Sequence, residues 1–204
     1  MMNKWLFPYG DPMVDKLIAD YFAENEAGST YINLCEEQEW PFLIDHLAIR
    51  CSDIDRRAKL FLEKGYLYQN EMVEYPDQGW WARVYRKSGY PTLFIDQAYV
   101  GKSGEKSILS AWVKQFGEDV FHHAAVLVTD IEKAIDGLRS KGIEFSGEIV
   151  GGRGTRLRQI FTTAEVRNGF PFTVLELTER NGYDGFYSEQ ANSLMQSSVK
   201  KKSV

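Results

Sequence analysis

The stretch IDHLAIRCSDIDRRAKLFLEKGYLY at residues 44–68 returns 77 positions later as FHHAAVLVTDIEKAIDGLRSKGIEF at residues 121–145. The two copies align His46 with His123, and they also match at an Asp-Ile pair and at a Lys-Gly pair. Self-similarity of this length is typical of a duplicated supersecondary unit. We therefore predict two copies of one strand-helix unit, each opening with a histidine, that build a single site around a pseudo-twofold axis.

The pattern within each copy predicts its local structure. Residues 43–51 and 120–128 have the two-residue periodicity of strands. An aspartate then precedes a run with helical periodicity and a glycine ends it, which predicts helices over 54–64 and 131–141. Further strands are predicted over residues 66–75, 80–87 and 91–97 in the first half, and over 145–150, 156–163 and 171–178 in the second.

The predicted architecture is α+β. Two tandem βαβββ modules form a half-open barrel around a metal-site cavity, and an N-terminal helix precedes them. That helix is predicted over residues 11–28, where an aspartate can cap it, a proline follows and a glycine ends it. The expected segments are an N-terminal helical extension (1–42), module one (43–100), a connector (101–119), module two (120–180), and a C-terminal lid helix with a disordered tail (181–204).

The composition is that of a globular protein with an acidic balance. Of the 204 residues, 44% are hydrophobic and 14% are aromatic, and the formal net charge is −5. This balance argues against nucleic acid as a partner, because the one lysine run, at 200–202, falls in the predicted tail. No apolar run reaches the length of a membrane span, and the N-terminus lacks the apolar core of a signal peptide. Two cysteines without metal-binding spacing fit reduced thiols, so we expect a cytoplasmic protein with no membrane partner.

Strand alternation predicts which side chains face the cavity. In the first strand His46, Ala48 and Arg50 share the face opposite the helix. In the second strand the same rule turns His123, rather than its neighbour His122, toward that face. The two copies therefore each present one histidine to a common site.

Two carboxylates are candidates to complete that site. Glu176 stands inside the apolar run FTVLELT at 172–178, and a buried carboxylate needs a partner or a metal. Two neutral imidazoles and one carboxylate make the facial triad of non-haem Fe(II) enzymes, which leaves coordination positions open for substrate and O₂. We predict this triad from His46, His123 and Glu176. Asp96, interpreted as the counterpart of Glu176 in module one, is a candidate fourth ligand, and four ligands would make a closed Lewis-acid site instead.

These residues resemble a known superfamily. The His-x-Ala strands and Asp-Ile helix starts, in two βαβββ modules, are similar to the vicinal oxygen chelate superfamily. In module two, RQIFT (158–162), VLELTER (174–180) and GF (185–186) resemble the catalytic half of the 4-hydroxyphenylpyruvate dioxygenases. The resemblance implies that the triad holds the metal, that Gln159 contacts the substrate, and that Phe186 lies on a lid helix over the pocket.

Arg50 follows His46 by four residues on the same strand face. The stretch DHLAIR resembles the His-x-x-x-Arg of the 2-oxoadipate dioxygenase/decarboxylase-like enzymes, which implies that Arg50 grips a substrate carboxylate. A guanidinium group suits bidentate recognition of a carboxylate. The competing interpretation is that Arg50 pairs with Asp96 or Glu176 and stabilises the barrel.

The predicted function is that of a non-haem Fe(II)-dependent dioxygenase that acts on a 2-oxo acid, with O₂ as co-substrate. Chelation of the 2-oxo acid at the metal would support the oxidative decarboxylation and hydroxylation of the resembled family. Two alternatives stay open: a glyoxalase- or epimerase-like lyase or isomerase that uses Mn, Zn or Ni as a Lewis acid, and a non-catalytic protein of the same fold that binds small molecules. The sequence leaves open which metal binds and whether the chain forms a homodimer.

Overall fold

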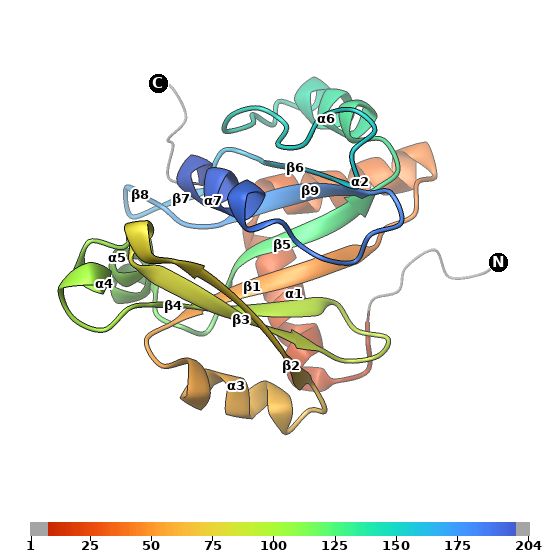
Figure 1. Cartoon of the computed structure of the whole chain (residues 1–204). Coiled ribbons are helices and arrows are strands. Elements are labelled where there is room, and N and C mark those ends of the chain that lie inside the picture. The colour runs from red at the N-terminus through yellow and green to blue at the C-terminus, as the bar shows by residue number, and fades with distance from the viewer. Residues whose placement is uncertain (1–7, 199–204) are drawn as a thin grey trace.

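A curled sheet of seven strands forms the body of the protein (Figure 1). The computed structural model describes residues 8–198, so the predicted tail beyond that point lies outside the described residues. The strands are β1 Ile44–Cys51, β2 Leu67–Tyr75, β3 Trp80–Arg86, β4 Thr92–Ala98, β5 Phe121–Val128, β6 Leu157–Phe161 and β9 Val174–Arg180, and a separate small hairpin is formed by β7 Val166–Arg167 and β8 Phe170–Pro171. Along the sheet the order is β2-β3-β4-β1-β5-β9-β6.

Helices cover both faces of this sheet (Figure 1). The outer face packs against α1 Pro12–Glu24, α2 Glu26–Gln38, α3 Ile54–Leu62 and α6 Ile131–Ser140. Inside the curl lies α7 Ser188–Ser197, and the connection from β4 to β5 holds α4 Lys102–Glu105 and α5 Ile108–Phe116. Across residues 8–198 no helix combines the length and the apolar character that a bilayer span requires.

The main apolar core lies between the sheet and its outer helices. Leu47 and Ile49 of β1, with Ala124 and Val126 of β5, are fully buried in it. These are the positions that alternation assigns to the helix side of each strand. Burial of this face leaves the opposite face of β1 and β5 free to line the inside of the curl.

The duplication predicted from the sequence is visible in the sheet. β1 and β5 pair as antiparallel neighbours at its centre, and each has a parallel partner from its own half, β4 beside β1 and β9 beside β5. His46 pairs with Ala125 and His123 pairs with Ala48, so the two histidines lie diagonally across the pseudo-twofold axis. The predicted α+β half-barrel is confirmed.

Both central strands carry a β-bulge directly before the histidine. The register between β1 and β5 shifts at two places, and the shifts leave Asp45 in β1 and His122 in β5 without an opposite residue. The two bulges occupy equivalent positions of the repeat. A bulge re-aims the side chain of the extra residue, and here it brings Asp45 and His122 next to the histidines that follow them.

The predicted single N-terminal helix over 11–28 is wrong, because the segment forms two helices, α1 and α2. Asn25 separates them with an extended backbone (φ −107°, ψ 108°). Its side chain accepts a hydrogen bond from the Gly28 amide at 2.7 Å and donates one to Thr173 Oγ1 at 3.0 Å. Gly28 does not end a helix; it packs within α2 so closely against the Phe22 ring that a Cβ would meet it at 2.8 Å.

The second module departs from its predicted strands. The strand expected over 145–150 is reduced to isolated bridges with Thr162 and Gln159, because Gly147 (φ +114°) breaks the extended path between them. The strand expected over 171–178 begins later, as β9, since the residues before it form the β7-β8 hairpin. The main sheet therefore has seven strands where two complete modules would supply eight.

Replacing Asn25 by alanine is expected to destabilise the fold by about 2 kcal/mol, because the change removes a helix cap and a buried hydrogen bond to Thr173. Urea unfolding followed by circular dichroism measures this loss. Asn25→Asp keeps the capping oxygen but not the amide donor, so a smaller loss is expected. Unchanged stability of Asn25→Ala would contradict the capping role.

Candidate metal centre

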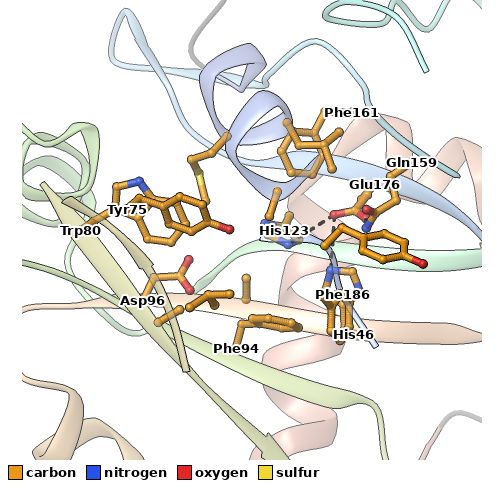
Figure 2. A pocket seen from close by; sticks show the side chains of 17 residues that line it. His46, Tyr75, Trp80, Phe94, Asp96, His123, Gln159, Phe161, Glu176 and Phe186 are labelled. Atoms are coloured by element: carbon orange, nitrogen blue, oxygen red, sulfur yellow. Dashed lines mark hydrogen bonds and ion pairs between the residues drawn. The ribbon is translucent and has the colours of Figure 1, made fainter. Parts of the chain in front are cut away.

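Three side chains from three strands converge inside the curl of the sheet (Figure 2). His46 comes from β1, His123 from β5 and Glu176 from β9. Glu176 Oε2 lies 3.3 Å from His46 Nε2 and 3.5 Å from His123 Nε2. All three residues are buried, and their potential ligand atoms lie within 4.8 Å of one another. The structure thus brings the three residues of the predicted triad together.

This set of atoms fits a divalent metal ion. Neighbouring ligands around an octahedral metal, with bonds of about 2.1 Å, lie about 3 Å apart, which is close to the separations seen here. Imidazole and carboxylate donors suit transition metals. Glu176 is 1% exposed as a residue and stands in an apolar strand, a position that favours a cation beside it.

Asp45 and Arg180 orient the His46 ring from the side away from Glu176. His46 Nδ1 lies 2.7 Å from Asp45 Oδ2. Arg180 holds both oxygens of that carboxylate, with Nε 2.6 Å from Oδ1 and Nη2 2.9 Å from Oδ2. A histidine that donates through Nδ1 presents its Nε2 lone pair to a metal. Sequence reasoning missed Asp45, because only the bulge turns it toward His46.

His122 has the matching position beside His123. Their Nδ1 atoms are 3.0 Å apart. Burial and the nearby Arg50 charge keep the pKa of His122 well below its usual value, so a neutral His122 can accept the Nδ1 proton of His123. As alternation predicted, His123 rather than His122 joins the triad, while His122, the extra residue of the bulge, lines the second cavity beside Arg50.

The second oxygen of Glu176 is held by two neighbours. Gln159 Nε2 donates to Glu176 Oε1 at 2.6 Å, and Thr178 Oγ1 donates to the same oxygen at 2.7 Å. These bonds leave Oε2 to face the histidines. Gln159 also lines the cavity, and its contact with a substrate stays a prediction. Thr178 was missed, although its place two residues after Glu176 puts it on the same strand face.

An aromatic ring occupies the place of a fourth ligand. Glu176 is the register partner of Ala125, and Phe94 is the partner of the equivalent Ala48. Phe94 is therefore the counterpart of Glu176. The interpretation of Asp96 as that counterpart is wrong, because Asp96 lies two residues further along β4. The halves differ in the lengths of their loops, which hides this register in the sequence. Asp96 lies outside the group of mutually close ligand atoms.

Arg50 and Asp96 are register neighbours in β1 and β4. In the part of the chain that the structure describes they form no direct ion pair, and Arg50 Nε and Asp96 Oδ2 have no hydrogen-bond partner. Arg50 Nη2 instead donates to the Met195 sulfur at 2.9 Å, and the guanidinium lies 5.3 Å from the Trp112 ring. Arg50 lines a second cavity beside α5 rather than the one that holds the triad. The direct pairing considered for Arg50 is thus not seen, and its grip on a substrate carboxylate stays a prediction.

The triad opens onto an aromatic cavity, and the empty space in and around it, open solvent included, is about 510 Å³. Tyr75, Trp80 and Phe94 line it together with residues of α7 (Figure 2). Phe186 lies just before α7 rather than on it, and its ring centroid is 5.2 Å from that of His46 and 4.6 Å from that of Phe94. Phe186 therefore packs directly beside His46 of the candidate metal centre.

Arg180 ties this segment to the metal centre. Arg180 donates two hydrogen bonds to the Asp45 carboxylate. It also donates from Nη1 to the carbonyl oxygens of Tyr183, at 2.9 Å, and Gly185, at 2.8 Å. Its guanidinium lies 4.6 Å from the Phe186 ring centroid. One side chain thus fixes both the support of His46 and the segment that leads into α7.

The electrostatics of the triad favour one proton, held by His46. Burial opposes a charge on His46, but the carboxylates of Glu176 and Asp45 outweigh it and raise the pKa of His46 to about 9. Burial, with the positive charges of His46 and Arg50, lowers the pKa of His123 to about 3. Burial would raise the pKa of Glu176, but the two histidines lower it. A metal bound here must displace the proton of His46.

No family model matches the sequence, and no curated protein matches it. Solved structures do match its fold. The hydroxyglutarate synthase of Oryza sativa, solved in complex with 2-oxoadipate, matches with a TM-score of 0.76 at 16% identity, over 92% of this chain and 91% of that one.

Two further structures extend the comparison. A glyoxalase superfamily protein from Ralstonia eutropha JMP134 has a TM-score of 0.70 at 13% identity, over 85% of this chain and 84% of its own. A mutant of 4-hydroxymandelate synthase from Streptomyces coelicolor has a TM-score of 0.57 at 21% identity, and this chain covers 54% of it with 78% of its own length. At these identities the likeness concerns the fold, and it agrees with the resemblance found in the sequence. The chain has the fold of the vicinal oxygen chelate superfamily.

Proposed function

We propose that the protein is a non-haem Fe(II)-dependent dioxygenase that acts on a 2-oxo acid. The observation that carries the proposal is Phe94 at the place of a fourth ligand, opposite Glu176 in the duplicated sheet. A phenyl ring cannot coordinate, so the metal keeps three protein ligands. Open coordination positions suit a bidentate substrate and O₂, whereas a closed Lewis-acid site would favour a carboxylate at Phe94.

A ferrous ion bound by the triad would supply a chelation point for the 2-oxo acid and would activate O₂ for oxidative decarboxylation. The residues around it prepare that site. Asp45 and His122 fix the orientation of the two imidazoles, and Gln159 and Thr178 fix the carboxylate. Phe94 and Phe186 exclude water from the side of His46.

The character of the cavity supports a small organic acid as substrate. Its walls are mainly aromatic and aliphatic, as in sites that bind small organic molecules. Binding of 2-oxoadipate by the rice hydroxyglutarate synthase, which shares the fold, agrees with a 2-oxo acid as the class. The approach of such an acid to the metal places its apolar part against Phe94 and the residues beyond it.

Metal content and oxygen uptake test the proposal together. Protein reconstituted anaerobically with Fe(II) is expected to hold about one iron per chain, and His46→Ala, His123→Ala and Glu176→Gln are expected to lose most of it. Glu63→Gln, at an exposed glutamate, is the matched control. With 2-oxo acids the loaded protein is expected to consume O₂ and release CO₂. Metal binding without oxygen uptake over a broad set of 2-oxo acids would overturn the dioxygenase proposal.

Phe94→Glu tests the role of the open coordination positions. A carboxylate at this place would complete a four-ligand site, so the variant is expected to retain or strengthen metal binding while oxygen uptake falls at least about tenfold. Phe94→Leu separates the loss of the ring from the gain of a ligand. Iron titrations and oxygen-electrode assays on both variants give the comparison. Undiminished oxygen uptake in Phe94→Glu would contradict the proposed need for three open positions.

The pH dependence of the free energy of unfolding of the metal-free protein tests whether His46 carries the proton that a metal would displace. The pKa of His46 is raised from 6.5 to about 9 in the folded, metal-free protein, so its contribution to stability is full below pH 6.5 and is lost as the pH rises through 9. We expect the free energy of unfolding of the metal-free protein to fall over this window, and to fall less in His46→Gln. The stabilisation added by a saturating metal is expected to grow over the same window. Chemical unfolding at a series of pH values, with and without metal, measures both, and parallel curves for the wild type and His46→Gln would contradict this assignment.

A further inference from the structure

Asp96 is a buried carboxylate that the metal centre leaves unused. Its side chain projects from β4 into the aromatic cavity, on the far side from Glu176 (Figure 2). The residue is 2% exposed, and its Oδ2 has no hydrogen-bond partner. A buried carboxylate oxygen without a partner destabilises a fold, which makes a role in ligand binding the natural reason for its presence.

The neighbours of Asp96 do not provide the missing bond. Arg50 directs a guanidinium nitrogen to the Met195 sulfur. Tyr75 donates its hydroxyl proton to the Ser188 carbonyl at 2.9 Å, and Trp80 donates its indole N–H to Gln78 at 3.1 Å. The hydroxyl of Tyr75 and the indole of Trp80 are therefore engaged elsewhere, and within residues 8–198 Arg50 Nε, itself without a partner, makes no bond to Asp96. This leaves Asp96 Oδ2 available to a donor on a ligand.

Aromatic rings line the cavity around Asp96, with Tyr75 and Trp80 at its end and Phe94 on the side of the triad (Figure 2). Tyr75 and Trp80 lie ring against ring with centroids 4.2 Å apart, and Phe94 lines the same cavity. Asp96 follows Phe94 by two residues on one strand face, a step of about 7 Å. A single six-membered ring with one substituent spans such a distance. The cavity thus has the candidate metal ligands at one end, an apolar aromatic wall, and the acceptor Asp96 at the other end.

We propose that Asp96 determines substrate specificity by accepting a hydrogen bond from an O–H or N–H group at the end of the substrate remote from the metal. The inference rests on the proposed function for the metal-binding end, a 2-oxo acid, and adds the chemistry of the opposite end. A substrate without this donor leaves Asp96 buried and unpaired, and it is rejected for that reason.

Small ring compounds test Asp96 without any metal. Phenol carries a hydroxyl, benzylamine carries an ammonium group, and toluene has a similar shape but no donor. Calorimetric or NMR titrations of the metal-free protein are expected to show phenol or benzylamine binding roughly tenfold more tightly than toluene, the effect of a hydrogen bond to a carboxylate. The preferred compound identifies the donor as hydroxyl or ammonium.

Asp96→Leu is expected to abolish the preference while toluene still binds. Asp96→Asn keeps the shape of the side chain and serves if the leucine variant does not fold, and it is expected to reduce the preference for benzylamine most. Phe94→Leu is the matched control in the same cavity, since it should weaken all three compounds without changing their ratio. Equal affinities in the wild type, no binding of phenol or benzylamine, or an unchanged preference in both Asp96 variants would overturn the inference.

A second titration separates this inference from the proposed function. Fe(II)-loaded protein is titrated anaerobically with phenylpyruvate and with 4-hydroxyphenylpyruvate, which differ only in the remote hydroxyl. Tighter binding of the hydroxylated acid to the wild type, lost in Asp96→Leu, supports both ideas. If neither acid binds but the phenol preference persists, the 2-oxo acid proposal fails and Asp96 keeps its role. If both acids bind equally well to wild type and variant, the role of Asp96 is overturned and chelation of a 2-oxo acid stands.

Discussion

The antiparallel pairing of β1 with β5 is the constraint on which the rest of the structure depends. This one ladder joins the two halves of the sheet and sets the distance between His46 and His123. The parallel partner of β5 then carries Glu176 to the same point. A slip of one residue in the ladder would turn every inward side chain outward. The apolar packing of the opposite face against four helices holds the register against such a slip.

Around the triad each ligand has its own support, and the supports come from different elements. Asp45 and Arg180 hold one imidazole, His122 holds the other, and Gln159 with Thr178 holds the carboxylate. Because Arg180 also binds the carbonyl oxygens of the segment before α7, the position of Phe186 is mechanically linked to the orientation of His46. Fixed ligands of this kind lower the reorganisation that metal binding requires.

The fold and the triad could be predicted because they leave periodic signals in the sequence. The stretch that recurs 77 positions later marks both histidines, and the apolar run around Glu176 makes that carboxylate stand out. What could not be predicted depends on single-residue irregularities. The two bulges add one residue each and re-aim Asp45 and His122, while unequal loops conceal that Phe94, rather than Asp96, corresponds to Glu176. Likewise, the break at Asn25 depends on a hydrogen bond to Thr173, a residue far away in the chain.

Phe94 and Glu176 occupy equivalent positions in the two halves but differ in chemistry, and this difference has an evolutionary consequence. In the two halves of the repeat, equivalent strands differ: β9 supplies the candidate metal ligand Glu176 and its hydrogen-bond partner Thr178, while β4 supplies cavity wall and the buried Asp96. Mutations in β4 can therefore reshape the cavity without removing a side chain of the candidate triad. Substitutions in the half with β4 can therefore change the shape of the cavity, while the half with β9 retains Glu176.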